Sequence, residues 1–272
     1  MAKLTTEQAM LRAKSHEKKG QVDQARLLYK MVLESFPNNK RVQQALAILD
    51  QSKPAVSTKA ANPPQDELDA LLELYNKGQL SAAVDQAQLL VLDFPASFLL
   101  WNIFGAANLG LRKLPEAEFG FRKAAELNPN YADAHNNLGT ALQEQGKLDE
   151  ALAAYQRALR LKPDYAAVHN NMGNALRNEG KFNEAIEAYK HALKINPNFV
   201  EVLNNIGNAQ TNLHTFENAL KSYQQAIKLK PDYAEAYNNM GVTLQYQGKL
   251  EEAIETYKRA LKIKPDYAEA YY

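Results

Sequence analysis

The sequence predicts an all-α fold, a solenoid built from antiparallel helix pairs. The first observation is a 34-residue stretch that occurs four times in succession. The copies are residues 132–165, 166–199, 200–233 and 234–267. The second observation is that positions 8, 20, 24 and 32 carry glycine, alanine, tyrosine and proline in every copy. A fixed period of this length is typical of folds in which each unit packs only on its neighbours.

Each repeated column has a packing reason. Positions 4, 7 and 11 share one face of the first helix, at spacings of three and four residues. Glycine at position 8 and alanine at position 20 are expected to let the two helices approach closely. A large residue in place of one of these alanines should overpack the pair by about 1–3 kcal/mol. Proline at position 32 ends the second helix and begins the next unit.

The turn between the two helices is predicted to hold one residue with positive φ. Gly146, Gly180 and Gly248 stand at this place in three copies, and a helix end favours glycine in the left-handed conformation. The remaining copy has His214 instead. A non-glycine residue is strained there, so this turn is expected to be the weakest of the four.

The pattern extends in weaker form toward the N-terminus. Residues 64–131 hold two divergent copies, so the array is predicted to span 64–272 and to be cut off within a further repeat. Residues 1–50 read as a divergent repeat-like helical segment, and 51–63 have the composition of a linker. Because no polar capping helix closes the array, the native protein is expected to continue past Tyr272.

Composition excludes several classes of protein. The formal net charge is +1 and there is no cysteine, so neither nucleic-acid binding nor a disulfide or thiolate metal site is predicted. The N-terminal residues lack the apolar stretch of a secretory signal, and no apolar run reaches the length of a membrane span. A soluble cytoplasmic protein without membrane contact is therefore expected.

No catalytic, cofactor or metal site is predicted. The chain has no phosphate-binding loop, nucleophile elbow or metalloprotease motif. His135 and His169 stand at position 4 of adjacent copies, which places them on the order of 10 Å apart. That separation is too large for two ligands of one metal at about 2 Å each. Both histidines are interpreted as packing residues, and the chain is not expected to be an enzyme.

The period and its residue columns together resemble the tetratricopeptide repeat (TPR) family. The resemblance implies a right-handed superhelix whose concave groove is lined by the first helices, mainly at positions 2, 5, 6, 9, 12 and 13. It also implies a protein that binds proteins or peptides. The TPR adaptors that grip chaperone C-termini use a lysine at position 5, where this chain has asparagine. A chaperone-tail ligand is therefore not expected.

Two groove columns are asparagine in all four copies. Asparagine is a mediocre helix former, and its amide offers two donors and an acceptor to the backbone of an extended peptide. Position 5 (Asn136, Asn170, Asn204, Asn238) is interpreted as the one more suited to bracing the neighbouring helix, and position 6 as the ligand contact. The predicted peptide-binding residues are Asn137, Asn171, Asn205 and Asn239 at position 6, with Asn174 and Asn208 at position 9.

This asparagine pattern resembles the superhelix of O-linked N-acetylglucosamine transferases, in which position-6 asparagines hold substrate peptide backbone. The segments AHNNLGTALQEQGKLDEA and AYNNMGVTLQYQGKLEEA carry the resemblance. The segment LLELYNKGQLSAAVDQAQLLVLDFP resembles bacterial proteins that place such an array before a glycosyltransferase or sulfotransferase domain. The resemblance implies a recruiting arm of a larger bacterial transferase. The alternative is a free-standing adaptor that assembles a complex or self-associates.

The groove columns turn apolar in residues 64–131. An apolar surface of this size is not expected to stay in water. It is predicted to be covered by residues 1–50 or by a second molecule, so a homo-oligomer through residues 1–50 or this groove is also considered. The residues are Leu68, Leu72, Tyr75, Leu99, Ile103 and Leu109.

Overall fold

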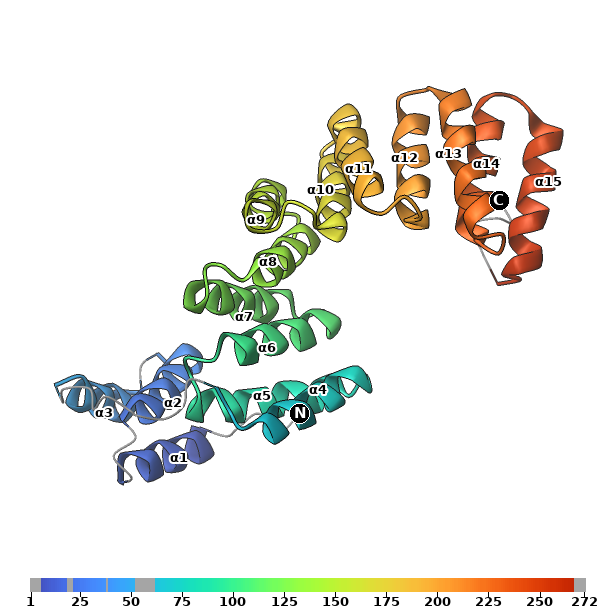
Figure 1. Ribbon diagram of the computed structural model, residues 1–272. Coiled ribbons are helices and arrows are strands. Elements are labelled where there is room, and N and C mark those ends of the chain that lie inside the picture. The colour runs from blue at the N-terminus through green and yellow to red at the C-terminus, as the bar shows by residue number, and fades with distance from the viewer. Residues whose placement is uncertain (1–5, 19–21, 38, 52–61, 267–272) are drawn as a thin grey trace. The chain divides into compact units, whose positions relative to one another are not determined.

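The computed structural model describes residues 6–18, 22–37, 39–51 and 62–266, and every regular element in these ranges is a helix (Figure 1). The chain divides into two compact units, Met1–Ala107 and Asn108–Tyr272. Most of the predicted linker, and the predicted cut-off repeat after residue 266, lie outside the described residues. The helices are α1 Thr6–Lys18, α2 Val22–Ser35, α3 Lys40–Gln51, α4 Gln65–Asn76, α5 Leu80–Asp93, α6 Phe98–Gly110, α7 Leu114–Leu127, α8 Ala132–Glu144, α9 Leu148–Leu161, α10 Ala166–Asn178, α11 Phe182–Ile195, α12 Val200–Asn212, α13 Phe216–Leu229, α14 Ala234–Tyr246 and α15 Leu250–Ile263.

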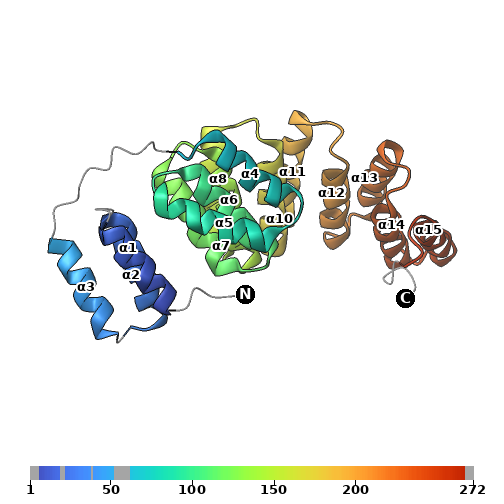
Figure 2. The same cartoon turned by 90° about the horizontal axis from the view of Figure 1, so that it is seen from below.

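The four regular copies fold as four equal helix pairs. The first helices α8, α10, α12 and α14 each have 13 residues, and their partners α9, α11, α13 and α15 each have 14. Each second helix also packs on the first helix of the next copy, so the pairs follow one another in series (Figure 1, Figure 2). The predicted frame of helix, turn and helix is confirmed in every copy.

The turns have the predicted positive φ. The angle is 76° at Gly146, 77° at Gly180, 74° at Gly248 and 57° at His214. The backbone N–H of the next residue bonds the carbonyl of the residue four positions before the turn, as in Lys147 N to Leu142 O at 3.0 Å. His214 is followed by the same bond, from Thr215 N to Gln210 O at 2.9 Å. The left-handed residue therefore lets the chain reverse and still satisfy a carbonyl at the helix end.

Arg112 takes the same place after α6 with φ 60°, and Gly78 does so after α4 with φ 71°. The sequence reasoning did not single out Arg112. The signal was present, because Arg112 stands at position 15 of its 34-residue frame, where the regular copies have glycine or His214. Counting positions identifies this turn where a search for glycine does not.

Inside each regular pair, the glycine at position 8 faces the ring of the tyrosine at position 24. A Cβ atom added at Gly173 would lie 2.4 Å from Cε1 of Tyr189, and Gly139 would meet Tyr155 in the same way at 2.5 Å. These distances are shorter than carbon atoms tolerate. Glycine is therefore needed so that a large ring, fully buried at Tyr155 and Tyr189, can fill the space between the helices.

Repeats also join through polar contacts. Glu118 of α7 accepts hydrogen bonds from Lys147 Nζ, Gln145 Nε2 and Arg122 Nε, each at 2.8 Å. Burial raises the pKa of this carboxyl, but the hydrogen bonds outweigh it and lower the pKa of Glu118 to about 2. In the regular copies the equivalent position 21 is leucine or isoleucine, so an apolar side chain takes the place of this carboxyl there.

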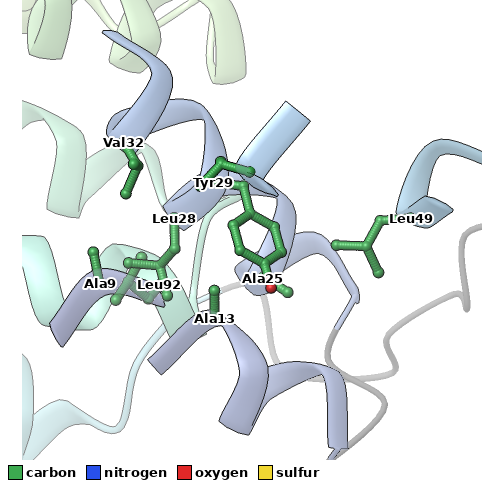
Figure 3. Packing of buried hydrophobic residues seen from close by; sticks show 9 residues of the cluster. Ala9, Ala13, Ala25, Leu28, Tyr29, Val32, Leu49 and Leu92 are labelled. Atoms are coloured by element: carbon green, nitrogen blue, oxygen red, sulfur yellow. The ribbon is translucent and has the colours of Figure 1, made fainter. Parts of the chain in front are cut away.

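Residues 6–51 form a helical cluster of their own. α1, α2 and α3 pack around Ala13, Tyr29 and Val42, and Leu92 of α5 joins the same cluster (Figure 3). Arg26 donates a hydrogen bond to the carbonyl of Leu49 at 2.9 Å, which ties α2 to α3. The described contact with α5 runs through Leu92, which is not one of the apolar groove residues. The hypothesis that this segment covers the groove stays a prediction.

Candidate functional site

The asparagines at positions 5 and 6 of the regular copies form a chain of hydrogen bonds between repeats, called here the asparagine ladder. The Nδ2 amide of position 6 donates to the Oδ1 atom of position 5 in the preceding repeat. The bonds are Asn171 to Asn136 at 3.1 Å, Asn205 to Asn170 at 3.0 Å, and Asn239 to Asn204 at 3.1 Å.

The ladder explains why both columns tolerate a poor helix former. Position 5 braces the next repeat, as its sequence suggested, and Asn170 and Asn204 are buried. Position 6 is also anchored, which the sequence did not indicate. An amide has two N–H donors and one carbonyl acceptor, and the ladder bond takes one donor. The bond therefore fixes the direction of the Asn171, Asn205 and Asn239 amides and leaves their other groups for further contacts.

The four position-6 asparagines differ in how enclosed they are. Asn137, Asn171 and Asn239 are half-buried, whereas Asn205 is only 7% exposed. Asn137 Oδ1 accepts a hydrogen bond from Asn136 Nδ2 at 3.2 Å. The structure thus brings the predicted set together as one series, with Asn205 offering the smallest accessible surface.

The position-9 asparagines hold the buried tyrosines. Tyr189 donates its hydroxyl to Asn174 Oδ1 at 2.7 Å, and Tyr223 donates to Asn208 Oδ1 at 2.8 Å. In the first regular copy Tyr155 donates instead to Gln143 Oε1 at 2.9 Å. Peptide contact by Asn174 and Asn208 stays a prediction, and the structure adds an internal role that the neighbouring tyrosine column could have suggested.

A polar cavity of about 490 Å³ lies beside Asn205. Glu235 accepts hydrogen bonds from Asn204 Nδ2 at 2.9 Å and from the Tyr233 hydroxyl at 3.4 Å. Glu201 is exposed and has no hydrogen-bond or ion-pair partner within the part of the chain that the structure describes. The cavity is lined by Asn196, Asn198, Phe199, Val200, Glu201, Asn205, Lys230, Tyr233 and Glu235.

The position-4 histidines have a structural partner. His135 Nε2 lies 3.0 Å from the Pro129 carbonyl, and His169 Nε2 lies 3.0 Å from the Pro163 carbonyl. Trp101 Nε1 donates to the Pro95 carbonyl at the same distance. A ring N–H at position 4 thus donates a hydrogen bond to the carbonyl of the position-32 proline, which follows the second helix of the preceding unit.

A second cavity, of about 630 Å³, opens between α9, α10 and α11. On its wall the rings of His169 and His191 stack at 5.4 Å between centroids, and burial lowers the pKa of His169. Three or more metal-ligand side chains do not gather at any point among the described residues. The sequence reasoning missed this cavity, since His191 had no partner at a recognisable spacing.

None of the predicted apolar groove residues is fully exposed. Leu68 and Ile103 are buried. Leu72, Tyr75, Leu99 and Leu109 are half-buried. Their partial burial is compatible with a further covering partner, which stays a prediction. Among the helices that the structure describes, none has the length and apolar character needed to cross a membrane.

Comparison with solved structures supports the fold. PilW, described as a widely conserved type IV pilus biogenesis factor, is 18% identical with a TM-score of 0.70, over 76% of this chain and 96% of PilW. Pseudomonas aeruginosa PilF is also 18% identical, with a TM-score of 0.65, over 76% of this chain and 94% of PilF. YrrB, described as a TPR protein with an unusual peptide-binding site, is 23% identical with a TM-score of 0.54, over 68% of this chain and 95% of YrrB.

No curated protein matches the sequence. Family models described as TPR repeat or tetratricopeptide repeat match residues 9–39, 121–153, 141–178, 173–213, 215–248 and 234–267. The match to 9–39 places the N-terminal cluster in the same family as the regular copies. The predicted all-α solenoid of helix pairs is confirmed, and the chain belongs to the tetratricopeptide repeat family.

Proposed function

We propose that this chain is a scaffold that binds an extended peptide along the position-6 asparagines Asn137, Asn171, Asn205 and Asn239. The observation that carries the proposal is the asparagine ladder. It anchors Asn171, Asn205 and Asn239 by the same bond in three consecutive repeats, so their remaining amide groups are presented at a regular interval.

The interval suits an extended backbone. Helices that pack against each other lie about 8–10 Å apart, and an extended chain advances about 3.3 Å per residue. One amide per repeat therefore meets about every third residue of a bound peptide. Amides that contact the peptide backbone do not select its side chains, so this column supplies affinity for many sequences.

Side-chain selection is assigned to the cavity beside Asn205. Glu201 and Glu235 face this cavity, and Lys230 is the basic residue in its lining. Lys230 Nζ lies 5.3 Å from the centre of the Tyr233 ring. The lysine ammonium group is therefore engaged in a cation–π contact with this ring. Glu201 thus has its charge available, and a lysine or arginine of the peptide is the complementary group.

The test compares two triple variants by peptide-binding affinity. Asn171→Ala with Asn205→Ala and Asn239→Ala removes the amide donors of position 6. Asn136→Ala with Asn170→Ala and Asn204→Ala breaks the same three ladder bonds from the other side. Each hydrogen bond contributes about 0.5–1.5 kcal/mol. The position-5 variant also removes the bonds from Asn136 to Asn137 and from Asn204 to Glu235, so it should lose more stability than the position-6 variant.

Only the position-6 variant should lose direct peptide contacts, about two- to tenfold in Kd for each amide. The readout is the affinity for a peptide selected from a random library against the intact chain. Equal affinity of the position-6 variant and the unmodified chain would refute the groove model. Glu201→Gln should weaken a lysine-containing peptide and leave its norleucine analogue unaffected.

A finer proposal is that the scaffold recruits substrate for a larger bacterial transferase. It rests on the resemblance to O-linked N-acetylglucosamine transferases and on the asparagine column. The measurement is the intact mass of the native gene product, detected with an antibody against the array. A species far above 30.5 kDa supports this proposal. A species near that mass contradicts it and favours a free-standing adaptor.

The adaptor alternative rests on the apolar groove, where Leu72, Tyr75 and Leu99 are only half-buried. An adaptor that self-associates through this surface should become monomeric in the Leu72→Lys variant, because a buried ammonium group is strongly disfavoured. Sedimentation velocity measures this directly. A chain that is already monomeric before the substitution rules out self-association through this groove.

A further inference from the structure

The cavity of about 630 Å³ between α9, α10 and α11 is separate from the asparagine ladder. Its wall on α10 consists of positions 4, 7 and 11, whereas the ladder uses positions 5 and 6 of the same helix. It shares no lining residue with the cavity beside Asn205. Its floor is apolar and is formed by Leu159, Met172, Leu176 and Ala188. An apolar cavity of this size with a few polar groups at its edge is the usual form of a ligand site.

The two ends of this cavity carry opposite charges. Arg160 of α9 stands at position 29 of its repeat, and Glu184 of α11 stands at position 19 of the next repeat. The two helices run in the same direction, because each packs antiparallel to α10. Ten positions at about 1.5 Å per residue therefore place the two charges about 15 Å apart along the helix axes. Both residues are exposed, and neither has a hydrogen-bond or ion-pair partner within the residues that the structure describes.

The preceding junction of second helices is bridged where this one is not. Arg122 of α7, at position 25, donates a hydrogen bond to Glu150 of α9, at position 19, at 2.7 Å. At the junction of α9 and α11, position 25 is Gln156, so Glu184 lacks the corresponding arginine. Within the described part of the chain, no ion pair joins α9 to α11 across the cavity.

We propose that this cavity binds an amphipathic helix of another protein. Its walls are helices whose backbone groups are bonded within each helix, so their backbones offer no hydrogen bonds to an extended peptide. A helical ligand satisfies its own backbone and is recognised through its side chains. The apolar side chains of the ligand cover Leu159 and Met172, which are half-buried in the chain alone.

The charges at the two ends set the ligand's sequence pattern and its direction. An acidic residue of the ligand faces Arg160, and a basic residue faces Glu184. Eleven helical residues advance about 16 Å and complete about three turns, so the two charged residues stand eleven positions apart on one face. A helix is stabilised by an acid near its N-terminus and a base near its C-terminus. The ligand helix therefore runs antiparallel to α9 and α11.

The probe is a fluorescein-labelled, hydrocarbon-stapled peptide of about 15 residues, mostly alanine and glutamine, because an unstapled helix of this length is marginal in water. It carries glutamate in its first turn, leucine four and seven residues later, and lysine eleven residues after the glutamate. The staple lies on the opposite face. Fluorescence anisotropy with the intact chain measures the affinity. Saturable binding is expected, and it should be lost when both leucines are replaced by glutamine.

Charge reversal tests the assigned end of the cavity. Glu184→Lys replaces an attraction to the peptide's lysine by a repulsion and should weaken binding about tenfold. A second peptide with glutamate in place of this lysine should bind the Glu184→Lys variant as tightly as the first peptide binds the unmodified chain. Glu201→Lys is the matched control, since Glu201 is also exposed and lies in the other cavity. It should leave the affinity for the first peptide unchanged.

A second variant closes the cavity with a bond that the chain already uses elsewhere. Gln156→Arg gives Glu184 the partner that Arg122 gives Glu150, and should weaken binding about fivefold. Gln224→Arg is its matched control, because Gln224 is exposed and stands at the same position 25 in a later repeat. Circular dichroism establishes that each variant stays folded.

Four results would overturn the inference. The first is no saturable binding of the stapled peptide at millimolar concentration. The second is equal affinity of the Glu184→Lys variant and the unmodified chain for the first peptide. The third is an equal loss of affinity in Gln156→Arg and Gln224→Arg, because the peptide would then respond to charge anywhere on the surface. The fourth is a dimer of the chain alone that Glu184→Lys dissociates in sedimentation velocity, because a second copy would then be the occupant.

Discussion

Helix pairs α4–α5 and α8–α9 share one frame but fill their interiors in opposite ways. Both turn through a left-handed glycine, Gly78 with φ 71° and Gly146 with φ 76°. In α8–α9 a glycine at position 8 faces the ring of Tyr155 at position 24. In α4–α5 the corresponding residues are Leu71 and Ala87, and both are fully buried. The large residue has moved from the second helix to the first.

The difference shows what the repeat frame requires. The turn residue and the helix bounds recur in both pairs, because they depend on backbone geometry. The interior needs one large and one small residue at these two positions, and either order fills the space. Cores tolerate exchanges that keep total volume and lose stability when only one partner changes.

The largest expected effect comes from moving the α4–α5 arrangement into α10–α11. Gly173→Leu alone forces carbon atoms into the Tyr189 ring and should cost about 3 kcal/mol. Tyr189→Ala alone leaves a cavity and should cost about 3–5 kcal/mol. The double variant should recover at least about 2 kcal/mol of the summed loss, as a double-mutant cycle measures it. Urea unfolding gives the four free energies.

The control pair joins Gly173→Leu with Tyr223→Ala, which lies in the next repeat. These positions have separate partners, since Gly173 faces Tyr189 and Tyr223 faces Gly207. Their losses should add. If the losses from Gly173→Leu and Tyr189→Ala also add in their double variant, the exchange hypothesis is wrong. The packing of α4–α5 would then not be explained by a large residue at position 8 replacing the one at position 24.

A smaller effect should distinguish helix pairs with a buried tyrosine at position 24 from α4–α5 at alkaline pH, in how the free energy of unfolding falls as pH rises. Burial raises the pKa of Tyr189 from 10.0 to about 12, while α5 has Ala87 and no tyrosine at this position. The neutral phenol is favoured in the folded state, so its contribution is fully present below pH 10 and is lost as pH rises toward 12. The loss amounts to at most about 3 kcal/mol for one tyrosine.

Tyr189→Phe should therefore flatten the fall in unfolding free energy between pH 10 and 11.5. At pH 7 it should cost only about 1 kcal/mol, for the hydroxyl bond to Asn174. Tyr246→Phe is the control for loss of a tyrosine hydroxyl at the surface, since Tyr246 is 67% exposed. Equal slopes for the unmodified chain and Tyr189→Phe would contradict the assigned cause.

The smallest expected effect tests the shared turn. A left-handed backbone costs a non-glycine residue about 1–2 kcal/mol, and His214→Gly removes this cost. Glycine also adds freedom to the unfolded chain, which offsets part of the gain. The net stabilisation of the repeat should be about 0.5–1 kcal/mol. The ring of His214 contacts Phe216 edge-on at 5.6 Å, and losing this contact reduces the gain. Gly180→His should change stability in the opposite direction. A destabilised His214→Gly variant would show that the ring contact outweighs the backbone strain.

The period alone was enough to predict the helix pairs and the strained turn at His214. These features repeat within 34 residues and follow from local rules on glycine, proline and apolar spacing. The distinction between positions 5 and 6 was less complete. Sequence columns showed that both were asparagine, but they could not show that Asn171 donates to Asn136, because the direction of an amide depends on the next repeat.

The close approach of the two helices inside a repeat was predicted, but the side chains that meet there were not. Glycine at position 8 indicated close approach of the second helix, and the structure shows that the approaching group is the tyrosine ring. Asn174 was assigned to a ligand, although the tyrosine 15 residues later provides it with an internal partner. The stacking of His169 on His191 had no spacing signal, since it depends on how two helices of one repeat face each other.

The ladder also bears on how such an array changes during evolution. Each bond joins residues 35 apart, which is one repeat length plus one residue. Duplication or deletion of a whole 34-residue unit in the gene therefore gives every donor an acceptor again at the new junction. Insertion of a single codon within a first helix turns the residues on its two sides about 100° relative to each other around the helix axis, and so separates the asparagines from the packing residues that position them. Selection on the ladder thus permits changes in copy number while opposing changes in repeat length.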